Sequence, residues 1–539
     1  MKKNLLTLLL CAAMTMASLA GCGGQSAPAA SGPEQPPSSG VSSSGKPADA
    51  PAPAADTPAS LIIPVASCVS NLNCQLESYK EGWIMLNPIY DQLYYMDVDE
   101  TRYYLAESYT MSEDNTTLTL KLKDGLTWHD GEPITADDVI FTLDVNKDTN
   151  NGAGNTNVVY LNEQPIAYEK VDGLTVKITL PAPSASYSNL LGKLKLLPMH
   201  AFGGNTNIVG AEANLQGIGS GPYKVVDFQQ DQYLQLEKFD GYYGGAPAID
   251  QVIFKIISDA SAQEVSLLNG EINFMELSTA EAAAKYASDA SFKVVAYPEG
   301  RVNYLAVNKF CETFNDPKVK EAVFAALNRD EIILGAYGEG MAEPANSIFS
   351  NVTLYYDGSV PSYTYDLDKA KTLVEEAGLS GKTMKLYFNS ERANMKETAQ
   401  IIQQQLKAAG ITLEVTPLES SGFFEKVFGT DGDYEFYLNG YAALGDPDEV
   451  VAGMYDGTWG VNIAVSDEAA QLWKDGRATS DTAKRKEVYK KLQEQANTDM
   501  SVYPIAYPNY TFVTTANLKG TDTYKTTPIF EDYTKLSFE

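Results

Sequence analysis

The sequence predicts an α/β protein with mixed sheets, and two stretches carry that prediction. Between Gly219 and Gly270, a tight-turn signal of glycine, serine and proline is followed by an extended run, a hairpin, a β-rich run and a helix. Between Met384 and Asn439, strands and helices alternate, as they do where right-handed crossovers build a parallel sheet. A chain of 539 residues that is 44% hydrophobic can bury several cores, and its length suggests about three domains.

The chain starts with the pattern of a secretory signal. Lys2 and Lys3 precede an apolar run from Leu5 to Ala13, and small residues follow this run. The run is too short to span a bilayer, which needs about 20 apolar residues. We therefore expect residues 1–21 to be a signal peptide that is cut before Cys22.

The end of this signal, with Leu19 to Gly21 before Cys22, resembles the lipobox of bacterial lipoproteins, whose signal is cut before a diacylated cysteine. The resemblance implies lipidation of Cys22 and an extracytoplasmic protein, lipid-anchored to the outer face of the bacterial cytoplasmic membrane. The alternative is a simple secreted protein with an incidental cysteine. Residues 22–60 are nearly all small or polar, so we expect a disordered tether between the anchor and the globular body.

The acidity of the chain limits its partners. The formal charge is −30, or −32 once Lys2 and Lys3 leave with the signal, which argues against a nucleic-acid-binding surface. Acidity reflects solubility more often than a cationic ligand, so we infer no substrate from it.

The cysteines leave two alternatives open. Cys68 and Cys74 could form a disulfide in an oxidising compartment, which would leave Cys311 free, or all three could stay reduced and buried. No pair of cysteines has the spacing of a zinc site, and we predict neither a metal nor a cofactor.

The first of the two stretches also carries a resemblance to a known family. It contains Gly-Ser-Gly-Pro-Tyr at 219–223, an aromatic loop in glycine at 241–245, a strand through Phe254 and a helix that Asp259 can cap. This order and spacing resemble the extracytoplasmic solute-binding proteins of ABC importers, in the peptide/nickel-binding group (solute-binding protein family 5, oligopeptide- and dipeptide-binding proteins). The alternative is an unrelated α/β domain with a glycine-rich loop.

The resemblance implies a two-lobed periplasmic-binding-protein-like fold with mixed sheets, an extra small domain and a two-strand hinge. The expected parts are a signal peptide at 1–21, a tether at 22–60, lobe 1 at 61–85, the small extra domain at 86–205, lobe 1 again at 206–297, lobe 2 at 298–505 and a return to lobe 1 at 506–539.

A repeated triplet marks the expected hinge. Ala296-Tyr297-Pro298 recurs as Ala506-Tyr507-Pro508, and both triplets should be extended because proline disfavours helix at the residue before it. In this family two crossing strands join the lobes, and the triplets fit that place unless the repeat is a coincidence.

Local signals predict further elements along the chain. Leu61 to Ala66 is typical of a strand, and Trp83 to Leu93 has apolar side chains at helical spacing. Thr135, Asp316 and Asp481 each stand where an N-cap precedes a helix.

Candidate ligand contacts follow from the resemblance and from side-chain chemistry. In the family the loop before the 83–93 helix lines the cleft, which implies Glu77, Tyr79 and Trp83 as contacts. Arg301 could clamp a ligand carboxylate or form a structural salt bridge. The full set of predicted ligand-binding residues is Glu77, Tyr79, Trp83, Arg301, Tyr441, Ala442, Asp446 and Trp459, whose aromatic members could instead pack in a core.

The loop after the last strand of the 384–439 sheet should face the cleft, because ligands bind at the carboxyl ends of parallel strands. Peptide-binding relatives usually place an aspartate in this loop to hold the α-ammonium group of the ligand. This chain has Ala443 or Leu444 there, depending on the gap chosen, so the usual anchor is missing. Asp446 or Asp448 could replace it, or Asp-Pro-Asp could simply form a turn.

We predict a binding protein with no catalytic residues. It would be the substrate-binding lipoprotein of an ABC transporter that captures an oligopeptide or dipeptide and delivers it to the permease and its ATPase. His129 could be catalytic, but a turn histidine fits better because no acid or nucleophile of fixed spacing accompanies it. The alternatives are a non-peptide solute such as an oligosaccharide, a surface adhesin or sensor with the same fold, and a secreted glycosidase using two of Asp446, Asp448 and Glu449.

Overall fold

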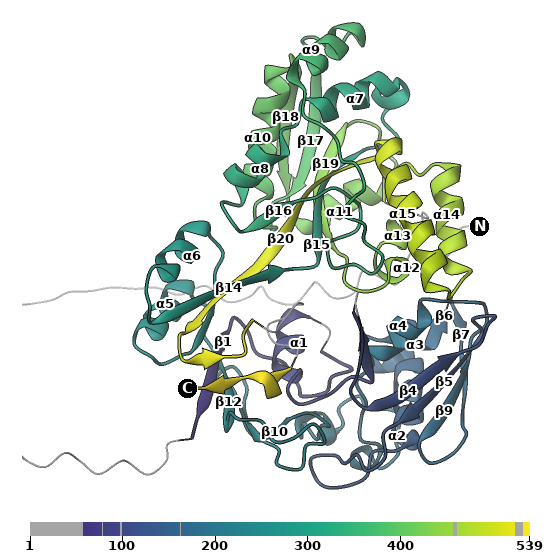
Figure 1. Ribbon diagram of the computed structural model, residues 1–539, viewed down its shortest axis with the longest axis vertical. Coiled ribbons are helices and arrows are strands. Elements are labelled where there is room, and N and C mark those ends of the chain that lie inside the picture. Colours follow the sequence, from purple (N-terminus) through teal and green to yellow (C-terminus); the bar gives the residue numbers. More distant parts are fainter. Residues whose placement is uncertain (1–57, 78, 98–99, 162, 456–460, 523–531) are drawn as a thin grey trace, which may run out of the picture. The chain divides into compact units, whose positions relative to one another are not determined.

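The computed structural model describes residues 58–539, except 78, 98–99, 162, 456–460 and 523–531 (Figure 1). The predicted signal peptide, nearly all of the predicted tether, the lipidation site Cys22 and the predicted contact Trp459 lie outside the described residues. None of the helices in the described part offers the length and the apolar run that crossing a bilayer requires.

The stretch that stands out in the sequence folds as predicted into strands, a hairpin and a helix. The strand order is β1-β12-β11-β10, with β1 parallel to β12 and the other neighbours antiparallel. The Asp259 side chain accepts a hydrogen bond from the backbone N–H of Ala262 (2.8 Å) and so caps the helix, and Gly270 follows in the left-handed conformation (φ 73°). The bounds are β1 (Ser60–Val65), β10 (Tyr223–Gln229), β11 (Tyr233–Lys238), β12 (Gln251–Ile256) and α5 (Ala260–Leu268).

The turn before β10 requires glycine because the backbone of Ile89 lies directly against it. A Cβ at Gly219 would overlap the carbonyl oxygen of Ile89, and the Gly221 N–H donates to that same oxygen (2.8 Å). His129 closes the turn, because the Gly219 N–H donates to its Nδ1 (3.1 Å) while its Nε2 lies 3.0 Å from the Gly221 carbonyl oxygen. These contacts require a neutral imidazole with its proton on Nε2, and they give His129 a structural role in the turn.

A second, four-stranded antiparallel sheet lies between β1 and β10 in the sequence, in the order β4-β5-β9-β8. The side chain and backbone N–H of Thr135 form a capping box with Asp138 at the start of α2, as the N-cap prediction requires. The core of this part holds buried side chains such as Trp128, Leu120 and Val139. The bounds are β4 (Ala106–Met111), β5 (Thr117–Leu122), β8 (Ala167–Lys170), β9 (Thr175–Thr179), α2 (Ala136–Lys147), α3 (Thr156–Val159) and α4 (Tyr187–Gly192).

The third sheet confirms the predicted alternation and adds antiparallel strands to it. Its path is β13-β20-β15-β19-β17-β18, where β17 pairs in parallel with both β18 and β19, and β15 pairs antiparallel with β19 and β20. The bounds are β13 (Phe274–Glu276), β14 (Phe292–Pro298), β15 (Arg301–Val307), β16 (Ala342–Pro344), β17 (Thr383–Asn389), α10 (Met395–Ala408), β18 (Thr412–Leu418), α11 (Ser420–Phe428), β19 (Phe436–Ala442) and β20 (Val502–Thr515).

The two Ala-Tyr-Pro triplets lie where strands pass from one part of this sheet to another. The first triplet ends β14, which is followed directly by β15. In β20 the pairing changes at the second triplet, because Ala506 pairs with Asn303 of β15 whereas Asn509 pairs with Pro298 of β14. Figure 1 shows β20 running from beside β15 to beside β14.

Helices flank these strands and begin at predicted caps. Asp316 accepts from the Lys318 N–H (3.0 Å) at the start of α7, and Asp481 accepts from the N–H groups of Ala483 and Lys484 at the start of α15. The remaining bounds are α6 (Ala280–Ala287), α7 (Pro317–Ala325), α8 (Arg329–Ala336), α9 (Leu367–Glu376), α12 (Pro447–Val450), α13 (Ala452–Tyr455), α14 (Asp467–Arg477) and α15 (Thr482–Asp499).

Two local predictions are corrected or decided. The predicted helix Trp83–Leu93 is wrong in its bounds, because α1 spans Lys80–Leu86 and Pro88 prevents its continuation. Of the two alternatives for the cysteines, the structure has all three free thiols. The boundaries of the seven expected parts stay predictions.

Candidate ligand-binding site

A cavity of about 220 Å³ lies where the chain crosses between β14 and β15, and we call it the crossing cavity. It collects residues from the β14–β15 turn, from β15, from the loop after β17 and from the second triplet. Its lining residues are Glu299, Arg301, Asn303, Arg392, Ala393, Asn394, Met395 and Pro508. The loop after β17 leaves a parallel strand at its carboxyl end, where open α/β sheets bind ligands.

The crossing cavity carries positive charge that its own acid does not balance. Arg301 Nε pairs with Glu299 Oε1 at 3.2 Å. Among the described residues, no carboxylate forms an ion pair with Arg392, and burial together with the neighbouring Arg301 lowers the pKa of its guanidinium. An anion bound beside Arg392 would relieve both effects, because it would replace lost hydration and screen the repulsion.

The same cavity holds an unpaired buried acceptor. Asn303 donates through Nδ2 to the Tyr337 hydroxyl (2.8 Å), but its Oδ1 has no hydrogen-bond partner. A buried acceptor without a donor costs about 1–3 kcal/mol, so a donor supplied by a ligand or by water would be stabilising here.

A second cavity of about 220 Å³ lies along α1, and we call it the helix cavity. Its polar lining comes from the loop before α1 and from the segment after α4. The lining residues are Cys74, Glu77, Gly82, Trp83, Leu86, Asn155, Lys193 and Lys195. Trp83 is 52% exposed on α1 and nearby Tyr79 is 41% exposed, so two of the predicted contacts present accessible aromatic faces.

Glu77 lines the helix cavity with a carboxylate that is already bonded. Its Oε1 accepts hydrogen bonds from the backbone N–H groups of Ser70 and Asn71 (2.9 and 3.0 Å), from the Ser70 hydroxyl (2.6 Å) and from the Asn71 amide (2.9 Å). The residue is 3% exposed. Glu77 therefore organises the loop before α1.

Lys195 is a second cation that forms no ion pair with an acid among the described residues. Its Nζ donates to Asn87 Oδ1 (3.1 Å), and burial lowers the pKa of its ammonium group. The charge of Asp91 acts on Lys195, but the Asp91 carboxylate itself accepts hydrogen bonds from the hydroxyls of Tyr242 (2.8 Å) and Tyr243 (2.5 Å).

The loop after β19 connects the two cavities. A Cβ at Gly300, next to Arg301, would overlap the Leu444 side chain, so Leu444 covers the turn at the crossing cavity. A Cβ at Gly445 would lie 2.6 Å from Lys193 Nζ, so the next residue reaches the lining of the helix cavity. Adjacent residues of one loop thus lie against Gly300, next to the crossing cavity, and against Lys193, which lines the helix cavity.

Ala443 and Leu444, which stand where relatives usually have the ammonium-binding aspartate, are apolar and packed. Ala443 is fully buried, and its carbonyl oxygen accepts from Ser350 Oγ (3.2 Å). Tyr441 is buried and its hydroxyl donates to the Ile348 carbonyl oxygen, whereas Ala442 is exposed and pairs across the ladder with Arg301. The ligand roles predicted for Tyr441, Ala442 and Arg301 stay predictions.

Asp446, the predicted replacement anchor, is buried in an ion pair. Its two carboxylate oxygens accept from Arg485 Nη1 (2.5 Å) and Nη2 (2.9 Å), and it is 1% exposed. The Asp448 backbone N–H also donates to Asp446 Oδ1 (3.0 Å), so the carboxylate caps α12 as well. Both oxygens are engaged by the protein itself.

Asp448 joins two parts of the chain that are far apart in sequence. Its carboxylate pairs with Arg477 Nε and accepts from the Ser186 hydroxyl (3.0 Å). Burial raises the pKa of Asp448. Ser186 lies just before α4, in the predicted small extra domain, so this contact connects that segment to the loop after β19.

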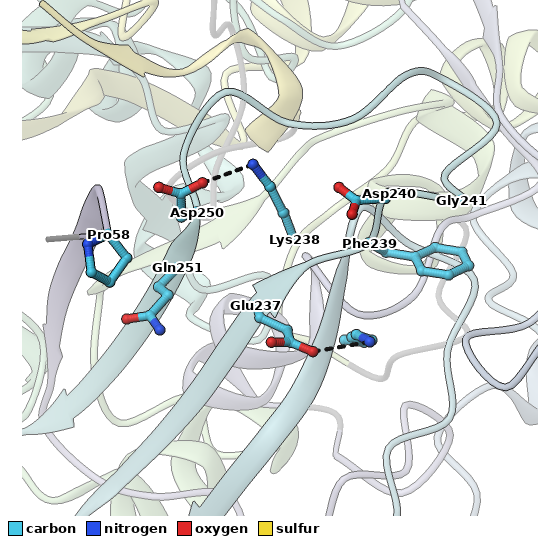
Figure 2. A pocket seen from close by; sticks show the side chains of 9 residues that line it. Pro58, Glu237, Lys238, Phe239, Asp240, Gly241, Asp250 and Gln251 are labelled. Atoms are coloured by element: carbon cyan, nitrogen blue, oxygen red, sulfur yellow. Dashed lines mark hydrogen bonds and ion pairs between the residues drawn. The ribbon is translucent and has the colours of Figure 1, made fainter. Parts of the chain in front are cut away.

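A third hollow, of about 370 Å³, lies on the first sheet beside β10, β11 and β12, and Figure 2 shows its lining. Its charged side chains satisfy one another: Lys224 pairs with Glu237 (2.9 Å) and Lys238 pairs with Asp250 (2.8 Å). None of the predicted contacts lines it, and we do not place the ligand there.

Sequence reasoning missed Arg392, Asn303, Lys193 and Lys195 as cavity residues. A signal existed for Arg392, because it follows the carboxyl end of a predicted parallel strand. No local pattern marks the other three residues, which become neighbours of the predicted contacts only through the fold. Among the described residues, no cluster of three His, Cys, Asp or Glu side chains could hold a metal ion.

The chain is similar to known binding proteins over most of its length. The family model described as bacterial extracellular solute-binding proteins, family 5 Middle, matches residues 100–462. The dipeptide-binding protein of Escherichia coli (strain K12) is 28% identical over 447 residues, which cover 75% of this chain and 81% of that protein. This is the family that the 219–272 stretch predicts.

Solved structures match the fold. The ABC transporter substrate-binding protein CtaP from Listeria monocytogenes has a TM-score of 0.82 at 33% identity, covering 89% of this chain and 99% of that chain. The oligopeptide-binding protein AppA from Bacillus subtilis, solved in complex with a nonapeptide, has a TM-score of 0.66 at 26% identity, covering 90% and 100%. The predicted two-lobed binding-protein fold with mixed sheets is confirmed.

Proposed function

The chain belongs to the bacterial extracellular solute-binding proteins of family 5, and from this membership we propose that it captures a peptide outside the cytoplasm for import by an ABC transporter. In this proposal Cys22 carries the lipid anchor, and an ABC permease with its ATPase receives the ligand. The names of the relatives support a peptide over an oligosaccharide, since they describe dipeptide and oligopeptide binding.

The observation that carries the proposal is the unpaired guanidinium of Arg392 in the crossing cavity. A peptide ends in a carboxylate, and a guanidinium can bind a carboxylate through two parallel hydrogen bonds. Arg301, which contacts Glu299, adds positive charge on the same side. We therefore place the C-terminal carboxylate of the peptide between Arg392 and Arg301.

The exposed aromatic side chains of α1 suit the rest of a peptide. Trp83 lines the helix cavity with about half of its surface accessible, so it can stack on a ligand side chain or on the peptide backbone. Extended peptides also offer N–H groups, and one of them could satisfy Asn303 Oδ1.

We propose that the lobes close about the two crossing strands when contacts of this kind form. A ligand shifts such an equilibrium only by its difference in affinity for the two states, and contacts from both lobes supply that difference. Small-angle scattering with and without saturating peptide checks this motion. Identical scattering curves would refute hinge closure while leaving peptide binding intact.

A glycosidase is not proposed, because two of its three candidate acids are engaged by the protein. Asp446 is held by Arg485, and Asp448 is held by Arg477 and Ser186. The names of the matched relatives describe binding proteins.

Native mass spectrometry of the full chain, gently purified from its expression host, tests the function. We expect a ladder of co-purified peptide masses that disappears after partial unfolding and refolding. Calorimetric titration of the refolded protein with di-, tri- and pentapeptides should then show saturable binding. Binding of an oligosaccharide such as maltotriose, with no peptide bound, would overturn the proposal.

A further inference from the structure

The charges around the two cavities are strongly one-sided. Four carboxylates lie at or near the cavities and the loop between them, and each is engaged by the protein. Glu77 accepts four hydrogen bonds, Glu299 pairs with Arg301, Asp446 pairs with Arg485 and Asp448 pairs with Arg477.

The cations show the opposite pattern. No described carboxylate forms an ion pair with Arg392 in the crossing cavity or with Lys195 in the helix cavity. This is unusual in a chain with a formal charge of −30, where acids outnumber bases by 70 to 40. A buried charge without a counter-charge is destabilising unless something else compensates it.

The same loop lies near both uncompensated cations. Leu444 covers the turn before Arg301, and Gly445 lies against Lys193, which lines the helix cavity beside Lys195. A ligand that follows this loop therefore passes from one cation to the other. An ammonium group on this path would find both oxygens of Asp446 and the Oε1 of Glu77 already bonded to the protein, and in the helix cavity it would face Lys195.

Resting on the proposed function, we propose that the site selects acidic peptides. Arg392 binds the terminal carboxylate of the ligand, and Lys195 binds a second carboxylate carried by an aspartate or glutamate side chain. The protein does not bind the ligand's α-ammonium group through a carboxylate, so blocking that group changes affinity little.

Calorimetric titration of the full chain with matched tetrapeptides tests this inference. Each peptide has a glutamate at one of the first three positions in an otherwise all-alanine sequence, and its partner has glutamine at the same position. Because hydrogen bonds to charged groups are the stronger class, we expect the best glutamate peptide to bind about tenfold more tightly than its glutamine partner. N-terminal acetylation should change either affinity by less than about threefold.

Three variants assign the charges. Lys195→Gln should reduce the glutamate-to-glutamine ratio to within about threefold of unity, whereas Arg392→Gln should weaken both peptides about tenfold or more and leave their ratio unchanged. The control is Lys371→Gln, which removes an exposed lysine of α9 and should change neither quantity. If Lys195→Gln does not fold, the ratio measured on the parent protein still decides the proposal.

The outcomes separate this inference from the function on which it rests. Equal affinities of glutamate and glutamine peptides at all three positions would overturn acid selection while peptide binding stands. A loss of about tenfold or more on acetylation would overturn the claim about the ammonium group. Failure of every tetrapeptide to bind would overturn the proposed function itself.

Discussion

Polar groups at the turn before β10 are satisfied by other groups of the protein, whereas polar groups at the crossing cavity are not. At the turn, the His129 ring bonds to the backbone of Gly219 and Gly221. Beside it, the Asp91 backbone N–H donates to the Ser220 hydroxyl (3.1 Å), and the Asp91 carboxylate accepts from the hydroxyls of Tyr242 and Tyr243. At the crossing cavity, Arg392 forms no ion pair and Asn303 Oδ1 accepts no hydrogen bond within the described part of the chain. The contacts of the first region stabilise the fold. The second region lacks an ion pair and a hydrogen bond that a ligand can supply.

Asp446→Ala should cause the largest loss of stability, because the Asp446–Arg485 pair is the most enclosed network near the site. The variant leaves the Arg485 guanidinium buried without its counter-charge, which typically costs about 3–5 kcal/mol. Urea unfolding followed by circular dichroism measures the change. Glu375→Ala on exposed α9 is the control and should unfold like the parent protein. A loss of unfolding free energy below about 1 kcal/mol would show that the protein does not depend on the Asp446–Arg485 pair.

The closed turn should also be visible in the pH dependence of stability. Burial raises the pKa of Asp91 to about 6, so its contribution is present at low pH and is lost as the pH rises from about 4 to 6. Burial lowers the pKa of His129 to about 4, so the contribution of its neutral form is lost as the pH falls from about 6.5 to 4. Each effect amounts to at most about 3 kcal/mol, and the two oppose each other.

Two variants separate these opposing terms. Asp91→Asn should make the unfolding free energy rise more steeply with pH than in the parent protein, and His129→Gln should make it rise less steeply or fall. Urea titrations at several pH values between about 4 and 6.5 measure the slopes. If both substitutions changed the slope in the same direction, the assignment of these two groups would be wrong.

Asp448→Asn should have an intermediate effect, because its carboxylate contacts Arg477 and Ser186, two residues that are remote from each other in sequence. The substitution weakens the pair with Arg477 and the bond from Ser186, and we expect a loss of about 1–2 kcal/mol in thermal or urea unfolding. Ser186→Ala keeps the Arg477 pair and should cost less. The reverse order of the two losses would show that Ser186, rather than Arg477, is the principal partner.

Arg392→Gln should have the smallest effect on stability, with the opposite sign. Removing an uncompensated charge beside Arg301 should raise the unfolding free energy by about 0–1 kcal/mol in the absence of ligand. Differential scanning calorimetry of the ligand-free protein measures it. A loss of more than about 1 kcal/mol would mean that Arg392 has a structural partner in the folded protein.

The fold was more predictable than the site because its signals are local. Asp259, Thr135 and Asp316 cap the helices that the sequence places after them, since a cap depends on residues two or three positions away. The turn at Gly219 is recognisable because only glycine tolerates the close approach of Ile89. The helix does not continue beyond Leu86 as predicted, because Pro88 overrides the helical spacing of the apolar residues after it.

The cavity residues could be predicted only in part because their neighbours are remote in sequence. Arg301 was a candidate from its place after the first triplet, but Arg392 approaches it from a loop about 90 residues away. Asp446 has the chemistry of an ammonium anchor, and the sequence does not reveal that Arg485 holds it from α15. Whether a charged side chain is paired within the protein or free to bind a ligand depends on such long-range partners.

The continuous strand β20 also affects how the protein is made. Its residues 502–515 lie between β13 and β15 in the sheet path and also pair with β14 and β16. During synthesis, every strand it joins leaves the ribosome earlier and must wait for it. Long-range pairing of this kind is slow to form. The nascent chain should therefore stay incompletely folded until these fourteen residues emerge, and a chaperone that holds exposed strand edges would act mainly before that moment.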